Sequence, residues 1–236
     1  MKIKRIGSYT TGFKYYKNDD EITDVKLLEK IKNMKIPPAY QNVTIVNNKK
    51  ILAYGYDSKN RKQVIYNSEY IKKQNSQKYD KIEDYEKYFL KIKNAIAKDI
   101  KSTNEKIKII AMIITLILSC GFRIGNKKYE KENNSHGLTT LKFSHISICE
   151  DKKNLIIFDF IGKKGVQNKA ICNNKYIYNY LLNKLINIQE KNEDFNNQYI
   201  FSYKDTCVNS NDVNRYLENK LKVKITSKDL RTWNAN

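Results

Sequence analysis

The sequence is poor in the residues that build metal sites, disulfide frameworks and phosphate-binding loops. Its 236 residues include four cysteines and two histidines. The cysteines form no CxxC pair and are too widely spaced for a zinc ribbon, so we expect reduced thiols at Cys120, Cys149, Cys172 and Cys207. The sequence also has no P-loop and no cluster of carboxylates suited to paired Mg²⁺. We therefore predict neither a metal nor a small-molecule cofactor.

The chain also lacks a long apolar run. The N-terminus, MKIKRIGSYT, has no apolar core of a secretory signal, so secretion is not expected. The longest apolar stretch, from Ile109 to Phe122, contains Thr115 and Ser119 and is shorter than the ~18 residues that a membrane span needs. We predict a buried core helix there, and an intracellular protein without a membrane partner.

Acidic residues are scarce relative to basic ones. The chain has 45 lysines and arginines against 25 aspartates and glutamates, a formal net charge of +20. This excess favours a polyanionic partner, nucleic acid first and an anionic membrane surface second. Abundant lysine, asparagine, isoleucine and tyrosine would also follow from an A+T-rich genome. Charge and its placement in the motifs below together favour nucleic-acid binding.

A change of pattern along the chain predicts two lobes. After Pro37-Pro38, the β-patterned runs NVTIV, ILAYGY and KQVIYN are separated by the turn signals NNKK and DSKN, which indicates a small antiparallel sheet. Residues 72–80 are polar, and helical periodicity starts after them. The apolar residues near one face of that helix are Tyr88, Phe89, Ile92, Ile96 and Ile100. We therefore place a β-rich lobe at residues 1–75 and a second lobe at residues 76–236.

The second lobe has the pattern of a mainly helical domain with a small sheet. Strands are predicted from Leu155 to Ile161 and from Val166 to Ile171, on either side of the turn GKKG. Helices are predicted from Tyr176 to Glu190 and from Asp212 to Leu221. The predicted fold class is α+β, a small antiparallel β-rich lobe followed by a mainly helical lobe with a three-stranded sheet.

An arginine directly follows the apolar helix, in the segment SCGFRIGNKKYEKEN. Gly121 can end the helix, and Arg123 then lies among apolar neighbours, where a guanidinium is costly unless it meets an anion. The anion could be a bound phosphate. The alternative is an internal ion pair with Glu130 or Glu132.

Basic residues gather in two further motifs. Lys127, Lys128 and Tyr129 suit phosphate contact and base-edge or sugar packing, or they form a solvated basic face. Lys163 and Lys164 occupy a tight turn between two glycines, so the turn can approach another backbone closely. Lysine at a hairpin tip is otherwise an ordinary turn residue.

The last motif is SKDLRTW. Ser227 can cap a helix on which Lys228 and Arg231 are spaced i and i+3, and therefore share a face. Two cations at a helix start are unfavourable with the helix macrodipole. Their presence is therefore better explained by anion binding than by helix stability. The alternative is a plain amphipathic helix with Leu230 and Trp233 facing the core.

The order of these motifs resembles the type IB DNA topoisomerases of the poxvirus and giant-virus type, which have bacterial relatives. An arginine ends a buried helix, KKYEKEN and GLTTLKFSHI follow, a lysine lies in a hairpin turn, and KDLRTW comes last. The resemblance runs from GYDSKNRKQVIY to the last residue. It implies a DNA breaking-rejoining fold for the helical lobe, and a monomer whose lobes close around double-stranded DNA as a clamp. A viral protein of this kind would act in the viral factory, the virion or the host cytoplasm, and a cellular one in the nucleoid or nucleus.

The resemblance also implies a mechanism. In this family a tyrosine attacks a DNA phosphodiester and forms a 3′-phosphotyrosyl link; the freed strand swivels before religation, which relaxes supercoils without ATP or metal. By the family pattern, Arg123 and Arg231 correspond to the clamp on the phosphate oxygens. Lys163 corresponds to the general acid for the departing 5′-oxygen, and Lys228 to a basic residue that supports the clamp.

The family lays the segment that resembles DSKNRKQVIY in the DNA major groove. The candidates for DNA contact are Lys59, Arg61, Gln63 and Tyr66 from this segment, and Lys127, Lys128, Tyr129, Lys164 and Lys228 from the second lobe. Val64 replaces a tyrosine of the poxvirus pattern, and Lys164 replaces an aspartate. We therefore expect a different site preference from that of the poxvirus enzymes.

The catalytic histidine and the nucleophilic tyrosine of the family lie downstream of KDLRT. In this sequence none of the 18 tyrosines follows Arg231, and Tyr216, the nearest one upstream, is expected to face the core. His136 and His145 both lie upstream, and His145 matches a non-catalytic position. We expect a C-terminally incomplete chain that binds DNA without cleaving it.

Two other interpretations remain open at this point. A tyrosine recombinase would carry a similar set of basic residues, although the β-patterned N-terminal lobe argues against it. A non-enzymatic DNA-binding or packaging protein would bind with little dependence on Arg123 or Lys163, because one phosphate contact among many changes affinity only modestly.

Overall fold

The computed structural model describes residues 2–149, 154–190, 194–204 and 206–234, and of residues 77–87 the backbone only. The chain divides into two compact units, Met1–Lys81 and Ile82–Asn236. Antiparallel sheets and helices occur together, which confirms the predicted α+β class. Within the described ranges, no helix combines the length and the apolarity needed to span a bilayer.

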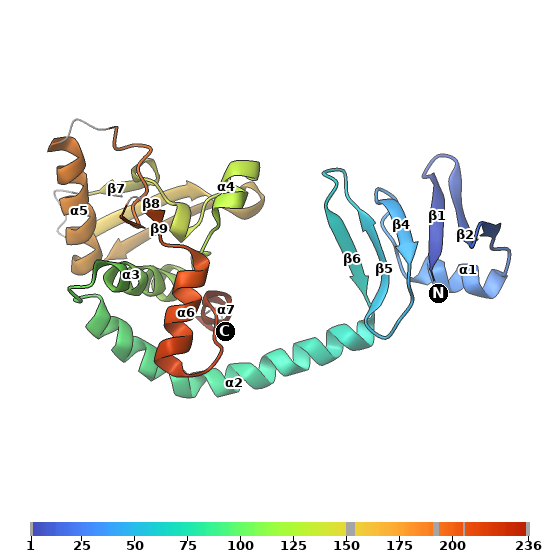
Figure 1. The fold of residues 1–236 in the computed structure, drawn as a ribbon, viewed down its shortest axis with the longest axis horizontal. Coiled ribbons are helices and arrows are strands. Elements are labelled where there is room, and N and C mark those ends of the chain that lie inside the picture. The colour runs from blue at the N-terminus through green and yellow to red at the C-terminus, as the bar shows by residue number, and fades with distance from the viewer. Residues whose placement is uncertain (1, 150–153, 191–193, 205, 235–236) are drawn as a thin grey trace. The chain divides into compact units, whose positions relative to one another are not determined.

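The N-terminal unit is an antiparallel sheet of six strands with a helix against one face (Figure 1). The strand order is β3-β2-β1-β4-β5-β6. The strands are β1 (Ile3–Ser8), β2 (Gly12–Lys17), β3 (Asp20–Glu21), β4 (Gln41–Ile45), β5 (Ile51–Tyr56) and β6 (Lys62–Tyr66). The helix α1 (Val25–Asn33) contributes Ile31 to a small core with Ile3, Ile45 and Ala53. The three strands predicted after the proline pair are confirmed as β4, β5 and β6.

One long helix, α2 (Ser68–Asp99), follows the sheet. The expectation that helical structure starts only after residues 72–80 is wrong, because these polar residues are helical as well. Residues 71–76 are all exposed, so no apolar stripe was needed there and no helical periodicity could be read. Further along, Ile92, Ile96 and Ile100 are buried, as predicted.

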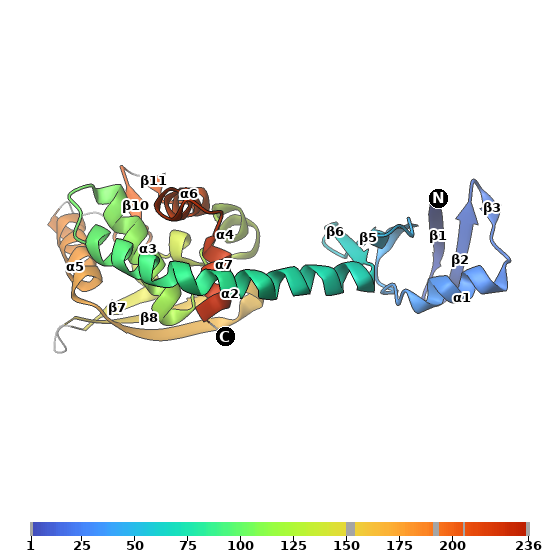
Figure 2. The ribbon, with the colours of Figure 1, turned by 90° about the horizontal axis from the view of Figure 1, so that it is seen from below.

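The C-terminal unit is built around α3 (Glu105–Cys120), of which eight residues are buried. The predicted core helix is therefore confirmed. The other helices are α4 (Lys127–Asn133), α5 (Lys175–Glu190), α6 (Ser210–Leu221) and α7 (Ser227–Asn234), with 3-10 turns η1 (Leu138–Thr140), η2 (Phe143–His145) and η3 (Lys163–Gly165). Figure 2 shows α6 and α7 close to α3, and the structure gives contacts between α7 and both of these helices.

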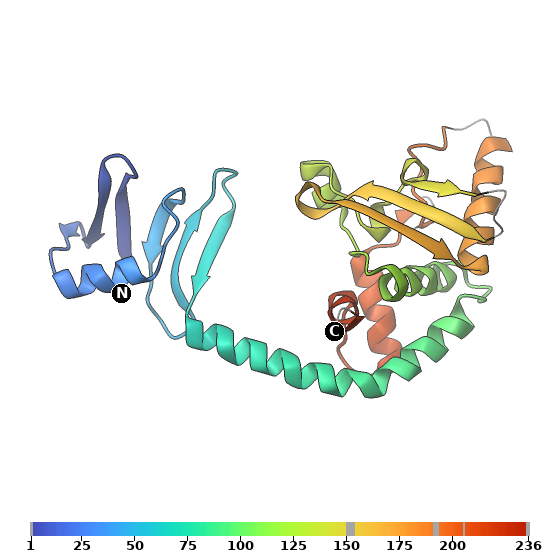
Figure 3. The same cartoon turned by 180° about the vertical axis from the view of Figure 1, so that it is seen from behind.

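A three-stranded antiparallel sheet packs on this helical core. Its order is β7-β8-β9, from β7 (Ile146–Ile148), β8 (Leu155–Ile161) and β9 (Gln167–Asn173), and a short pair, β10 (Ser202–Tyr203) and β11 (Thr206–Cys207), lies apart from it. Figure 3 shows the two long strands β8 and β9 side by side, close to the green helix α3. Alternate residues of β8 are buried, with Ile156, Phe158 and Phe160 in the core. The predicted hairpin around GKKG is confirmed.

Candidate nucleic-acid interface

Arg123 emerges where α3 ends. Gly121 adopts a left-handed conformation (φ 66°) that closes the helix, as its lack of a side chain allows. Phe122 is buried, with its ring 5.5 Å from that of Phe158 and 5.0 Å from that of Phe160. This anchor fixes the backbone one residue before Arg123, whose own side chain is exposed.

Arg123 is not neutralised by the carboxylates that the sequence offered. Glu130 pairs with Lys142 (3.3 Å), and Glu132 pairs with Lys128 (3.8 Å). Within the described residues, no ion pair includes Arg123. The alternative of an internal pair with Glu130 or Glu132 is therefore wrong.

A backbone junction joins the Arg123 segment to the hairpin of Lys163. The amide of Leu138 donates to the carbonyl of Arg123 (2.9 Å), and the amide of His136 donates to the carbonyl of Ile161 (2.9 Å), two residues before Lys163. The chains approach so closely that a Cβ on Gly137 would lie 2.6 Å from Gly125 Cα. Only glycine fits this crossing without displacement of backbone.

The hairpin turn itself presents two lysines to solvent. The amide of Gly162 donates to the carbonyl of Val166 (2.8 Å), and Lys164 has φ 65°, a left-handed conformation that a lysine rarely adopts. Lys163 and Lys164 are exposed, and in the described part of the chain neither ammonium has an ion-pair partner. The turn therefore leaves both charges available to a ligand.

Helix α7 carries Lys228 and Arg231. The sequence predicted Ser227 as its cap, and this prediction is wrong. The cap is Thr226, because the Thr226 hydroxyl accepts from the Asp229 amide (3.3 Å) and Asp229 accepts from the Thr226 amide (3.0 Å). Ser227 is buried, and its amide donates to Asn214 Oδ1 (2.9 Å). The reciprocal cap satisfies the amides of Thr226 and Asp229 at the start of the helix.

Arg123 and Arg231 interact electrostatically. Burial, and secondly the positive charge of Arg123, lower the pKa of Arg231. The two guanidinium groups are therefore within electrostatic range, although they come from segments more than a hundred residues apart along the chain. Arg231 is half-buried, and among the described residues it has no carboxylate partner. Such a pair is unfavourable in the free protein and would be relieved by an anion between the two groups.

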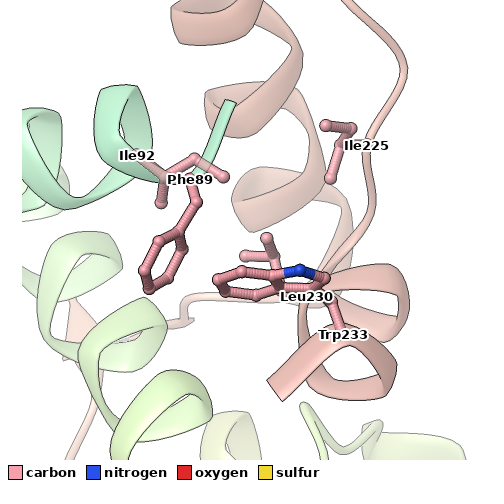
Figure 4. A pocket seen from close by; sticks show the side chains of 5 residues that line it. All are labelled: Phe89, Ile92, Ile225, Leu230 and Trp233. Atoms are coloured by element: carbon pink, nitrogen blue, oxygen red, sulfur yellow. The ribbon is translucent and has the colours of Figure 1, made fainter. Parts of the chain in front are cut away.

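Aromatic packing fixes α7 on α2 (Figure 4). The rings of Trp233 and Phe89 lie with their centroids 3.9 Å apart, over a small apolar pocket that Ile92, Ile225 and Leu230 complete. Leu230 is buried and Trp233 is half-buried, so the helix is amphipathic, as the alternative interpretation expected. Because this packing fixes the helix, it also fixes the position of Arg231 on it.

Helix α4 presents the Lys127, Lys128 and Tyr129 cluster. Tyr129 is 59% exposed, and both lysines are exposed. The Lys127 ammonium lies 5.2 Å from the centre of the Tyr199 ring. These three residues are therefore accessible to a partner, whereas Glu130 on the same helix turns inward.

The candidates in the N-terminal unit are partly engaged by an aspartate that sequence reasoning missed. Asp57 Oδ2 accepts from Arg61 Nε (2.9 Å) and from Gln63 Nε2 (2.9 Å). The bond from Arg61 is the largest of the effects that lower the pKa of Asp57 to about 2. Lys59 is exposed in the turn, and Tyr66 is 41% exposed. The sequence DSKNR carried a signal for this network, since aspartate often accepts from amides that follow it in a turn.

Aromatic rings with lysines over them extend this surface. The Lys62 ammonium lies 4.2 Å from the centre of the Tyr54 ring, and the Lys50 ammonium lies 5.3 Å from that of Tyr70. Tyr66 stacks on Tyr70 with ring centroids 5.7 Å apart. The pairing of β5 with β6 could have predicted the contact of Lys62 with Tyr54, whereas Tyr70 lies on α2.

Both histidines and Tyr216 have structural surroundings. His136 is buried, and its Nδ1 donates to the carbonyl of Thr140 (3.1 Å). Burial, with the charges of His136 and Lys142, lowers the pKa of His145 to about 4. Tyr216 is buried and donates to Asp99 (2.7 Å), which confirms that it faces the core.

Comparisons with known proteins identify the family of this chain. Residues 67–236 match the family model "Eukaryotic DNA topoisomerase I, catalytic core", and residues 12–57 match "Bacterial DNA topoisomerase IB, N-terminal domain". The chain is 31% identical over 231 residues to DNA topoisomerase 1B of Acanthamoeba polyphaga mimivirus, covering 94% of this chain and 66% of the relative. It is 28% identical over 181 residues to DNA topoisomerase 1B of vaccinia virus (strain Copenhagen), covering 66% of this chain and 54% of the relative.

A more distant match is 26% identical over 166 residues to human DNA topoisomerase 1, covering 68% of this chain and 20% of the relative. The chain thus spans less than two thirds of the length of each of these relatives. The matches favour the topoisomerase interpretation over a tyrosine recombinase. The chain belongs to the type IB DNA topoisomerase family.

Proposed function

We propose that this protein takes part in the relaxation of supercoiled DNA by type IB chemistry, and that residues 1–236 supply the groups that bind the duplex and hold the reacting phosphate. The observation that carries the proposal is the pair Arg123 and Arg231. Two guanidinium groups lie within electrostatic range, and in the described residues no carboxylate pairs with either. A phosphate between them would accept donors from both forks and cancel their repulsion.

The chemistry assigns a separate role to each cation. A tyrosine oxygen attacks the phosphorus, a 3′-phosphotyrosyl bond forms, and the bond to the 5′-oxygen breaks. Negative charge grows on the two non-bridging oxygens, where Arg123 and Arg231 stabilise it. Lys163 gives its proton to the departing 5′-oxygen, and Lys228 adds positive charge beside the clamp. Religation reverses these steps, so no external energy source enters the balance.

Residues 1–236 are proposed to bind DNA without supplying the nucleophile. Tyr216 is the last tyrosine in the sequence, and it is buried and donates to Asp99. Desolvation and this bond raise its pKa, which disfavours the phenolate. A reaction at Tyr216 would need α6 to leave the core.

Double-stranded DNA is the proposed partner, and each unit supplies contacts to it. The proposed contacts of the N-terminal unit are Lys59, Arg61, Gln63 and Tyr66. A monomer with two such surfaces suffices for a clamp, and its place of action is wherever intracellular duplex DNA lies. The proposed contacts of the C-terminal unit are Lys127, Lys128, Tyr129, Lys164 and Lys228.

The test combines plasmid relaxation with duplex binding. Negatively supercoiled plasmid is incubated with residues 1–236 without ATP or Mg²⁺, and a short linear duplex is titrated in parallel by gel shift at several salt concentrations. We expect salt-sensitive binding and no relaxation. Relaxation, or a covalent protein–DNA adduct, would show that a tyrosine among these residues is the nucleophile. Absence of binding would reject DNA as the partner.

The same titration distinguishes a packaging protein from a phosphate clamp. Arg123→Ala and Arg231→Ala are compared with Lys204→Ala, an exposed cation outside the proposed site. A clamp requires larger losses at the two arginines than at Lys204. Equal and small losses at all three positions would favour general charge binding.

A further inference from the structure

Helix α4 is too short and too exposed to hold its own shape. It has seven residues, and none of them is buried. Isolated helices of fewer than ~12 residues are marginal in water. Its first two residues, Lys127 and Lys128, place positive charge at the end where the helix dipole is already positive. Asn126 caps the helix through the Lys128 amide (2.8 Å), and contacts with the rest of the C-terminal unit add to this local support.

Glu130 makes the central contact of this kind. Its Oε2 accepts from the Tyr199 hydroxyl (2.9 Å), and its Oε1 lies 3.3 Å from the Lys142 ammonium and 4.0 Å from His136 Nδ1. The Glu130 side chain is 13% exposed, against 53% for Glu132 on the same helix. One carboxylate thus binds Tyr199 and Lys142, which both lie outside α4, and lies near His136.

The partners of Glu130 belong to a rigid frame. Lys142 and Tyr199 face each other across an isolated antiparallel bridge, and the amide of Phe143 donates to the carbonyl of Gln198 (3.1 Å). The amide of Lys142 donates to His145 Nδ1 (3.0 Å), which holds this segment from the other side. Because the frame is fixed by backbone bonds, a helix attached to it inherits its position.

We propose that Glu130 is a positioning residue that fixes α4, and with it Lys127, Lys128 and Tyr129, for contact with duplex DNA. This inference rests on the proposed function of the interface. Removal of an acidic side chain makes the surface more positive, which by charge alone would strengthen DNA binding. The proposal predicts the opposite: loss of the Glu130 carboxylate weakens DNA binding.

Glu132 provides a matched control. It lies two residues further along α4, it is exposed, and its carboxylate is 3.8 Å from the Lys128 ammonium. Glu130→Gln and Glu132→Gln change the net charge equally on the same short helix. Electrostatics alone predicts that both substitutions strengthen DNA binding to a similar extent.

The experiment measures the affinity of residues 1–236 for a short duplex by fluorescence anisotropy across a range of salt concentrations. We expect Glu130→Gln to bind about tenfold more weakly and to lower the salt slope by about one to two, because the phosphate contacts of α4 are lost. We expect Glu132→Gln to bind equally or up to about threefold more tightly. Equal behaviour of the two variants would overturn the proposal.

Two further measurements keep the proposal testable whatever the first outcome. Tyr199→Phe removes one hydrogen bond to Glu130 without a change of charge. This variant is used in place of Glu130→Gln if Glu130→Gln does not fold. Unchanged affinity and unchanged salt slope of Tyr199→Phe would count against the proposal. If the wild-type chain does not bind DNA, the proposed function fails. Hydrogen exchange of residues 127–133 then decides the inference alone, with faster exchange expected in Glu130→Gln than in Glu132→Gln and equal exchange contradicting it.

Discussion

The two units hold their candidate DNA-binding groups in different electrostatic states. In the N-terminal unit, Arg61 and Gln63 both donate to Asp57, so a carboxylate already occupies the place that a phosphate would take. In the C-terminal unit, burial and then the positive charge of Arg123 lower the pKa of Arg231, and the described residues give neither arginine a carboxylate partner.

This difference separates two ways of using a cation. A surface pair such as Arg61 and Asp57 contributes little to folding, so DNA can replace the carboxylate at small net cost. The positive charge of Arg123 opposes that of Arg231, and a phosphate between them would remove this repulsion. Under the proposed function, we expect the N-terminal unit to make adjustable duplex contacts and the C-terminal unit to hold one phosphate.

The largest predicted effect concerns the packing of Trp233 on Phe89, which holds α7 in place. Trp233→Ala removes the contact with Phe89 and frees α7 from α2. We expect the C-terminal unit to lose about 2–3 kcal/mol of unfolding free energy, less than a fully buried tryptophan would cost because Trp233 is half-buried. Chemical denaturation monitors the loss. Trp233→Phe, which keeps an aromatic ring at this place, should lose less than half as much; equal losses would contradict the assigned contact.

The second prediction sets the acid sensitivity of one unit against that of the other. The pKa of His145 is about 4 in the folded protein and its ordinary value is 6.5, so the unfolded chain binds this proton first. Stability from this group is present above pH 6.5 and is lost as the pH falls toward 4. After allowance for its half-exposed ring, we expect a loss of about 1–2 kcal/mol from the C-terminal unit.

The N-terminal unit should respond in a lower window. The pKa of Asp57 is lowered from 3.8 to about 2, so its contribution is present above 3.8 and is lost as the pH falls toward 2. Unfolding curves of each unit between pH 7 and pH 4 test the contrast. His145→Asn, which keeps an acceptor for the Lys142 amide, should flatten the curve of the C-terminal unit, and an unchanged slope would count against neutral His145 as the cause.

The smallest predicted effect is at Asp57. Asp57→Asn removes the charge that competes with DNA for Arg61, and we expect binding about two- to threefold tighter. Glu29→Gln on α1 is the control, because it makes the same change of charge at an exposed position away from the candidates. Weaker binding by Asp57→Asn than by Glu29→Gln would mean that Asp57 orients Arg61 for contact.

Much of the fold could be predicted from the sequence, because buried helices and strands repeat apolar residues at the spacing of their secondary structure. The α3 helix, the β8–β9 hairpin and the strands β4 to β6 all have such a pattern. The strands β1 to β3 were not predicted, because lysines, glycines and aromatics mix there without clean alternation. The first turns of α2 were missed because a solvated helix needs no apolar stripe.

The site could be predicted as a set of residues but not as a set of relationships. The motifs named Arg123 and Arg231, which lie far apart in the sequence. Their electrostatic interaction depends on the packing of α7 against α3, which no local pattern predicts. Glu130 was considered only as a partner for Arg123. Its actual partners, Tyr199 and Lys142, are set by a bridge between distant segments that no local pattern signals.

The most direct test of the central claim is a double-mutant cycle on Arg123 and Arg231, read out as affinity for a short duplex at fixed salt. If the two side chains hold one phosphate, each single alanine variant should bind about tenfold more weakly, and the double variant only slightly more weakly than either. Independent losses that add, or losses no larger than that of Lys204→Ala, would contradict a shared phosphate clamp.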